Sequence, residues 1–191
     1  MKRIKMKSKK TKNVAVFPGS FNPVHPGHLT TIYQAVQVFD KVIVLVASNP
    51  EKTYAVPAKT RMTWIKNFFK DTKLEKKISY DVTDKGLTEY CESKGITTVI
   101  RGIRNQADMD FEESQREYNN VLKKNMEFEL NYVYFAADKH TKHLSSTAVR
   151  QFLKFADIKQ FSDLFFNACW TTGTELRQKT LKEILDIYHG W

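Results

Sequence analysis

The residues best suited to chemistry lie in one short stretch, residues 17–29, which reads FPGSFNPVHPGHL. It follows a run typical of a buried strand (residues 14–17) and precedes a helical pattern (residues 29–39), so we expect a Gly- and Pro-rich turn from a strand into a helix. Backbone amides and the helix dipole bind phosphate at such a position. Two imidazoles, His25 and His28, stand three residues apart at the exit of this turn. We therefore interpret the stretch as a phosphate site with two histidines at its mouth.

Two further stretches carry groups that bind phosphate. The sequence RGIRN at residues 101–105 offers two arginines, whose guanidinium groups bind phosphate bidentately, and Gly102 would let a ligand approach the backbone. The sequence LSSTAVR at residues 144–150 pairs consecutive hydroxyls with the start of a helix, where Ser145 or Ser146 would be the cap. Taken singly, each stretch is also what an ordinary surface pair of arginines or an ordinary helix cap looks like.

The pattern of the chain alternates strand and helix, which predicts an α/β fold with a parallel sheet covered on both faces. We expect strands at residues 13–17, 41–47, 77–82, 97–100 and 130–136, and helices at 27–39, 57–70, 87–93, 108–124 and 145–155. Ligands bind beyond the carboxyl ends of strands in such sheets. The three stretches above, and Lys52, each follow a predicted strand, so we expect them to meet at one edge.

The predicted organisation is a single domain with two additions. Residues 1–12 form a basic tail, residues 13–165 a Rossmann-like, doubly wound domain with five parallel strands, and residues 166–191 a helical extension. The extension carries an apolar stripe at helical spacing, which predicts docking on the core or on a sister subunit. The stripe comprises Leu176, Leu181, Ile184, Leu185 and Tyr188.

Composition narrows the function classes. The net charge is +10, and seven of these charges lie within residues 1–12. A nucleic-acid-binding module built on this tail is an alternative, but it leaves both histidines, the arginine pair and the Ser-Ser-Thr unexplained. No apolar run approaches the ~20 residues of a membrane span. Cys91 and Cys169 are isolated and no secretory signal begins the sequence, so we expect a reducing, cytoplasmic compartment.

The order of these motifs resembles bacterial phosphopantetheine adenylyltransferase, a member of the nucleotidylyltransferase superfamily with its His-x-Gly-His motif. The resemblance covers roughly residues 14–164, and the element at residues 101–105 narrows it from the superfamily to this family. It implies a five-stranded parallel sheet and the transfer of the adenylyl group of ATP to the 4′-phosphate of phosphopantetheine, in coenzyme A biosynthesis. It also implies Mg²⁺ that enters with ATP, no metal site built by the protein, and a hexamer.

The resemblance assigns roles residue by residue. His28 would stabilise the transition state at the α-phosphate, while Lys52 and Arg101 would hold the acceptor phosphate and complete the catalytic set. The substrate phosphopantetheine would contact Ser20, Lys52, Leu87 and Arg101. The ATP contacts would be Ser20, Phe21, His25, His28, Gly102, Ile103, Arg104, Glu112 and the loop Thr141, Lys142, His143, Leu144, Ser145, Ser146 and Thr147.

The sequence departs from the family pattern at positions that shape the acceptor pocket or flank the motifs. These departures are Asn22 for Asp, His25 for Thr, Thr53 for Lys, Ser114 for Gln and Gln151 for an acidic residue. Two related enzymes stay open as alternatives: nicotinate or nicotinamide mononucleotide adenylyltransferase, and a cytidylyltransferase for a polyol phosphate. The element at residues 101–105 argues against the first.

Overall fold

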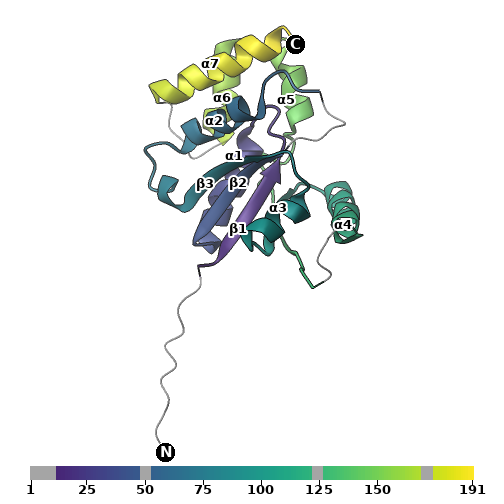
Figure 1. Ribbon diagram of the computed structural model, residues 1–191. Helices are drawn as coiled ribbons and strands as arrows, with labels where there is room; N and C mark the ends of the chain where they lie inside the picture. Colours follow the sequence, from purple (N-terminus) through teal and green to yellow (C-terminus); the bar gives the residue numbers. More distant parts are fainter. Residues whose placement is uncertain (1–11, 48–52, 122–126, 169–173) are drawn as a thin grey trace, which may run out of the picture.

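Five parallel strands form one sheet at the centre of the molecule (Figure 1). The computed structural model describes residues 12–47, 53–121, 127–168 and 174–191. The strands form where β-branched and other apolar residues run together, as expected for strands buried on both faces. They are β1 (Val14–Gly19), β2 (Lys41–Ala47), β3 (Ile78–Thr83), β4 (Thr98–Ile103) and β5 (Asn131–Ala136). The predicted α/β fold with five parallel strands is confirmed.

The strand order β3-β2-β1-β4-β5 creates a switch point in the middle of the sheet. The chain builds outward from β1 to β3 on one side, then crosses over and builds from β4 to β5 on the other. Loops that leave β1 and β4 therefore diverge, and the crevice between them at the carboxyl edge is where such sheets bind ligands. The RGIRN element lies at the carboxyl end of β4 and the His-containing turn follows β1, so both lie beside this crevice.

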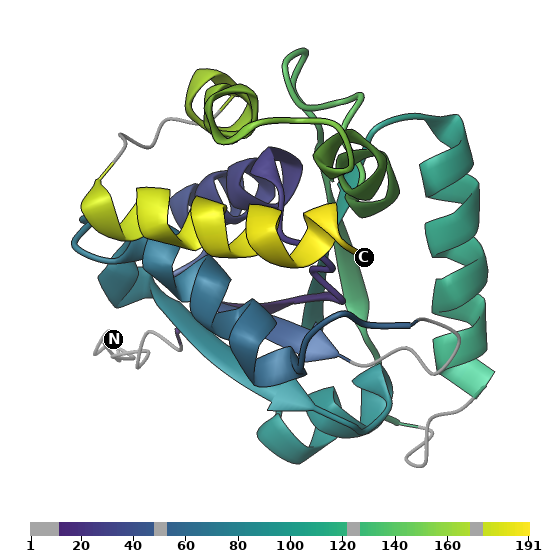
Figure 2. The same cartoon turned by 90° about the horizontal axis from the view of Figure 1, so that it is seen from above.

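Helices cover both faces of the sheet (Figure 2). They are α1 (Pro26–Val38), α2 (Ala58–Phe69), α3 (Leu87–Lys94), α4 (Gln106–Val121), α5 (Ser146–Leu153), α6 (Ile158–Ala168) and α7 (Glu175–His189), with a 3₁₀ turn at Glu75–Lys77. Alternate residues of β1 face opposite sides: Ala15 and Phe17 lie in a large core with α1, α2, α6 and α7, whereas Val16 lies in a smaller core with α3.

Strand β4 is longer than the sequence predicts. We expected it to end at residue 100, but it continues to Ile103, because Arg101 pairs with Tyr134 of β5 and Ile103 pairs with Ala136. Glycine has low strand propensity, yet the ladder with β5 holds Gly102 and Arg101 extended. Arg101 and Gly102 therefore lie within the sheet and not in a loop beyond it.

The C-terminal helix α7 docks on the core, as its apolar stripe predicts. Leu181, Ile184 and Tyr188 are buried in the larger core. Arg177, which the stripe does not include, is also buried and donates from Nε to the carbonyl of Phe68, 3.1 Å away, at the end of α2. The domain boundary at residue 165 stays a prediction. In the structure this residue lies inside α6. Among the described residues, no helix is long and apolar enough to span a bilayer.

Candidate active site

The turn after β1 is a tightly built loop, residues 19–28. Phe21 has a backbone φ of 47°, in the left-handed region that bulky residues rarely adopt, and its side chain is fully buried. A Cβ on Gly19 would lie 2.9 Å from the Phe21 ring, so only glycine fits there. The same ring lies edge-on to His28, with ring centroids 4.8 Å apart. The loop thus folds over a buried phenylalanine that supports one of the two histidines.

The two histidines occupy different environments. The rings of His25 and His28 lie 3.7 Å apart between centroids, but only 6% of His25 is exposed, so the expectation that both stand at the mouth of the site is wrong for His25. Burial lowers the pKa of His25 well below its usual value, and the nearby His28 and Arg104 lower it further. The backbone at Gly27 packs closely on this ring, because a Cβ there would lie 3.0 Å from it.

His28 is held in one tautomer. The backbone N–H of His25 donates to Nδ1 of His28 at 3.2 Å, so Nδ1 is an acceptor and the proton of the neutral ring lies on Nε2. His28 stands in the first turn of α1, where the helix dipole favours negative charge. The side chain therefore presents an N–H donor at the start of α1.

Arg101 joins three elements at the end of the sheet. Its Nε lies 2.8 Å from Oε2 of Glu112 on α4, and its Nη1 donates to the carbonyl of Pro18 on β1 at 3.2 Å. Both side chains of the ion pair are only 17% exposed. Burial raises the pKa of Glu112, while the adjacent Arg101 partly offsets this by lowering it. Glu112 is thus an anchor for the guanidinium that the sequence assigned to the acceptor phosphate.

Gly102 is required by packing between β4 and α1. A Cβ at this position would lie 2.9 Å from Oγ1 of Thr31. The sequence suggested that Gly102 lets a ligand approach the backbone. The structure shows that it also lets α1 pack closely against β4.

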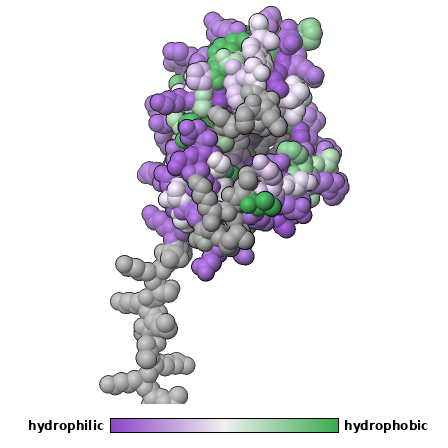
Figure 3. All heavy atoms as spheres, turned by 45° about the vertical axis from the view of Figure 1, so that its right-hand side comes forward, coloured by the Kyte–Doolittle hydropathy of each residue, from purple (hydrophilic) through white to green (hydrophobic). Residues whose placement is uncertain are grey.

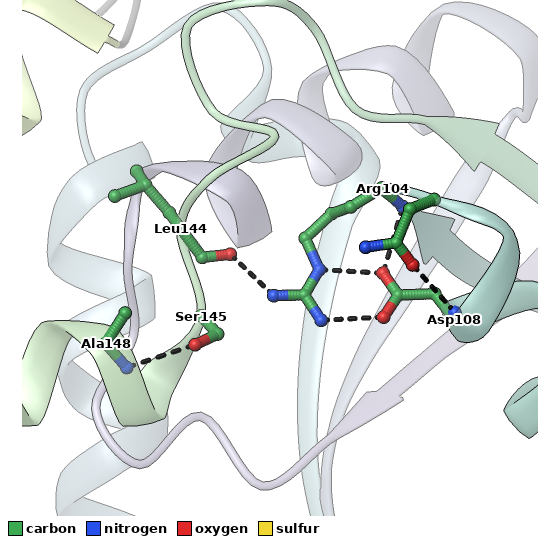
Figure 4. Close-up of polar contacts among 6 residues, drawn as sticks. Arg104, Asp108, Leu144, Ser145 and Ala148 are labelled. Carbon is green, nitrogen blue, oxygen red and sulfur yellow. Dashed lines mark hydrogen bonds and ion pairs between the residues drawn. The ribbon is translucent and has the colours of Figure 1, made fainter.

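Arg104 links the start of α4 to the segment before α5 (Figure 4). Its Nε and Nη2 bind the two carboxylate oxygens of Asp108, each at 2.7 Å, and its Nη1 donates to the carbonyl of Leu144 at 3.1 Å. Hydrogen bonds from Arg104 lower the pKa of Asp108. The sequence did not single out Asp108, although an acidic residue four positions after an arginine at a helix start is a recognisable pairing.

The start of α5 closes onto the same loop. Ser145 is the N-cap, as predicted, and its Oγ accepts from the amide of Ala148 at 3.0 Å (Figure 4). Ser146 donates from Oγ to the carbonyl of Pro23 at 3.0 Å. Thr141 is buried and is held by Asp138, whose Oδ1 accepts from the Thr141 amide at 3.1 Å. The segment at residues 141–147 therefore lies beside both Arg104 and the His-containing loop.

Two side chains that the sequence analysis did not assign to the site hold the His-containing loop in place through hydrogen bonds. Arg61 of α2 donates from Nη1 to the carbonyl of Ser20, and Tyr188 of α7 donates its hydroxyl hydrogen to Oδ1 of Asn22. From α5, Arg150 donates to the carbonyl of Asn22. Arg61 lies on the apolar face of α2, one turn before Ile65, so a charged residue on that face was the available signal. For Tyr188, the sequence carried no signal beyond its place in the apolar stripe of α7.

The predicted site residues therefore gather as follows. Ser20, Phe21, His25 and His28 come together with Arg101 to Arg104 and the segment 141–147 around the β1–β4 switch point, through the contacts above. Leu87 begins α3, which follows β3 at the same edge of the sheet. Lys52 lies outside the described residues. Within the described part of the chain, no cluster of three or more metal-ligating side chains occurs.

The sequence matches the cytidylyltransferase-like family over residues 16–152. It is 34% identical over 139 residues to the phosphopantetheine adenylyltransferase of Clavibacter michiganensis subsp. michiganensis, covering 72% of this chain and 82% of that one. The corresponding protein of Mycoplasma capricolum subsp. capricolum is 36% identical over 138 residues, covering 72% of this chain and 94% of the relative.

Among solved structures, the fold is similar to nicotinic acid mononucleotide adenylyltransferase from Plasmodium falciparum, complexed with NaAD. The TM-score is 0.61, with 93% of this chain and 98% of that one covered, and the identity is 15%. This likeness supports the fold alone. The match over residues 16–152 and the identities above 30% carry the assignment: the chain belongs to the cytidylyltransferase-like family and, within it, to the phosphopantetheine adenylyltransferases.

Proposed function

We propose that the protein transfers the adenylyl group of ATP to the 4′-phosphate of phosphopantetheine, giving dephospho-CoA and pyrophosphate in coenzyme A biosynthesis. Family membership supports the reaction. The structural observation that carries it is the fixed tautomer of His28, whose Nδ1 accepts from the His25 amide and whose Nε2 therefore carries the proton.

The chemistry is an in-line displacement at phosphorus. An oxygen of the 4′-phosphate forms a bond to the α-phosphorus of ATP, and the bond from that phosphorus to the pyrophosphate oxygen breaks. A phosphate monoester is already a nucleophile, so the protein contributes positioning and charge stabilisation. Nε2–H of His28 would donate to an α-phosphate oxygen as negative charge accumulates there. The start of α1 adds its dipole to the same charge.

Arg101 of β4 and Arg104, which follows the strand, would hold the two anionic reactants together. A guanidinium carries five N–H donors. Arg101 donates one of them to the carbonyl of Pro18 and is paired by charge with Glu112. We assign Arg101 and Lys52 to the acceptor phosphate, and Leu87 to the pantetheine arm. Ser20 would contact both substrates, and the remaining ATP contacts would be Phe21, His25, Gly102, Ile103, Arg104, Glu112 and residues 141–147.

Mg²⁺ fits this site as part of the ATP complex. The carboxylates nearest the arginines, Glu112 and Asp108, are each engaged in an ion pair. The phosphate oxygens of ATP would therefore supply the ligands of Mg²⁺ in place of protein side chains. Bound there, Mg²⁺ would neutralise charge on the departing pyrophosphate.

We also propose a homo-oligomer, a hexamer by family resemblance, in the cytoplasm. Hydrophobic side chains form separate patches on the largely hydrophilic face in Figure 3. On α4, Phe111, Tyr118 and Val121 are all exposed and share one face of the helix by their spacing. Analytical ultracentrifugation of the purified protein tests the assembly.

The reaction is tested by following pyrophosphate release with ATP or CTP and one acceptor at a time. The acceptors are phosphopantetheine, nicotinate mononucleotide, nicotinamide mononucleotide and glycerol 3-phosphate. We expect release only with ATP and phosphopantetheine, together with dephospho-CoA by mass spectrometry. Turnover of a mononucleotide, or of CTP with the polyol phosphate, would replace the proposal by the corresponding alternative.

A further inference from the structure

A hydrogen bond connects the C-terminal helix to the active-site loop. We propose that Tyr188 of α7 is a positioning residue for the reaction, which acts through Asn22 to hold residues 19–28, between the end of β1 and the first turn of α1, and to fix the chain at Thr53. This inference rests on the proposed adenylyl transfer.

Asn22 is the hub of the connection. Its Oδ1 accepts from the Tyr188 hydroxyl, and its Nδ2 donates to the carbonyl of Thr53 at 3.1 Å. Asn22 is 3% exposed and Tyr188 is 1% exposed, so water does not compete for these contacts. Thr53 comes directly after Lys52, the residue assigned to the acceptor phosphate. One buried amide therefore joins α7, the His-containing loop and the chain at Thr53.

The loop has a physical need for such support. The left-handed backbone of Phe21, next to Asn22, is strained for a bulky residue and persists only where neighbours fix it. Arg61 and Arg150 bind the carbonyls of Ser20 and Asn22, on either side of Phe21. Tyr188 fixes the Asn22 side chain between them. His28 follows six residues later, so a displacement of the loop changes where its Nε2–H points.

Tyr188 is itself held in place. Its ring lies edge-on to Trp64 of α2, with centroids 6.2 Å apart, and Arg177 ties the same helix to Phe68. Burial raises the pKa of Tyr188 to about 12, so the hydroxyl stays protonated and remains a donor at neutral pH. The amide oxygen of Asn22 accepts from this donor without adding a buried charge.

The test is a double-mutant cycle with Tyr188→Phe, Asn22→Ala and the double variant in the full chain. Loss of one neutral buried hydrogen bond predicts that Tyr188→Phe lowers kcat/KM about three- to tenfold, with part of the loss in a higher KM for phosphopantetheine. Because Tyr188 acts through Asn22, the double variant should lose no more than Asn22→Ala alone. The matched control is Tyr80→Phe, which deletes a hydroxyl from β3, away from the loop.

Hydrogen exchange of the ligand-free proteins supplies a readout that needs no substrate. We expect the amides of residues 20–28 to exchange faster in Tyr188→Phe than in the wild type and in Tyr80→Phe. If Tyr188→Phe does not fold, Asn22→Ala is compared with the wild type for exchange across residues 53–57 and 175–189, where faster exchange is expected.

Three results would overturn the inference: wild-type kcat/KM in Tyr188→Phe, additive losses in the double variant, or unchanged exchange of the loop. An inactive wild-type protein would instead count against the proposed function. The exchange comparison would still decide whether Tyr188 supports the loop.

Discussion

His25 lies directly behind His28, with their ring centroids 3.7 Å apart, and its amide fixes the tautomer of the outer ring. The inner ring is buried and the outer ring is more accessible. Because burial lowers the pKa of His25, a neutral inner imidazole packs against the outer one without placing a second positive charge beside it. The motif therefore divides two roles between two identical side chains.

Replacing His28 by Ala should lower kcat by about 10² or more while the affinity for ATP changes little. The reason is that one preorganised donor to a developing charge contributes roughly this factor. His28→Gln, which can place an N–H near the position of Nε2, should recover part of the rate. Steady-state kinetics and ATP titration by calorimetry measure both. Nearly intact turnover in His28→Ala would remove this residue from the mechanism.

Acidification should destabilise the protein through His25. Its pKa is lowered in the folded state, so the unfolded chain binds this proton more readily and the free energy of unfolding falls as pH drops below about 6.5. The slope attributable to one such group is at most about 1.4 kcal/mol per pH unit. Thermal unfolding at pH 7.5, 6.5 and 5.5 measures it. His25→Thr, the residue common in the family, should flatten the dependence; an identical slope would show that other groups cause it.

Gly27→Ala should distort the histidine pair. The added Cβ would lie 3.0–3.1 Å from ring atoms of His25, which is buried and has little room to move. Overpacking of this kind costs about 1–3 kcal/mol of stability, and the shift of His25 should also lower kcat. Gly86→Ala, where a Cβ meets nothing within 4 Å, is the matched control. Equal Tm values for both variants would contradict the tight contact.

Asp108→Ala should weaken ATP binding. Without the bidentate carboxylate, Arg104 loses the partner that aims its third contact at the carbonyl of Leu144. We expect KM for ATP to rise about tenfold, with a smaller change in KM for phosphopantetheine. Arg116→Ala, which breaks an exposed ion pair with Glu113 on the same helix, should leave both values unchanged. An unchanged KM for ATP in Asp108→Ala would separate this ion pair from the nucleotide site.

Deletion of residues 1–11 should leave kcat and both KM values unaltered, because the site is assembled from residues that follow β1. Any binding to nucleic acid should weaken in the deletion variant and fall steeply with salt. Activity assays and fluorescence anisotropy with a labelled oligonucleotide distinguish the two functions. A large loss of turnover would assign the basic segment a part in catalysis.

The sheet was predictable because buried parallel strands leave continuous apolar runs, and β2 was predicted at its observed bounds. The convergence of the loop after β1 with the RGIRN element also followed from topology, since carboxyl ends of parallel strands share one edge. The length of β4 was not predictable, because pairing with β5 overrides the low strand propensity of Gly102.

Contacts between distant segments were equally hidden. Nothing local to Asn22 indicates that its partner is Tyr188, 166 positions away. The burial of His25 depends on how the loop folds over Phe21, and the apolar pattern of the stretch does not record it. Sequence therefore located the chemical groups, whereas their supports depend on tertiary packing.

The position of α7 has a consequence for biosynthesis of the protein. Leu181, Ile184 and Tyr188 complete the same core that contains Ala15 and Phe17 of the first strand. During translation, this core stays open until residues 181–188 have left the ribosome, so an unfinished polypeptide exposes apolar surface to chaperones and proteases. We therefore expect the truncated product of a nonsense codon before residue 181 to be degraded.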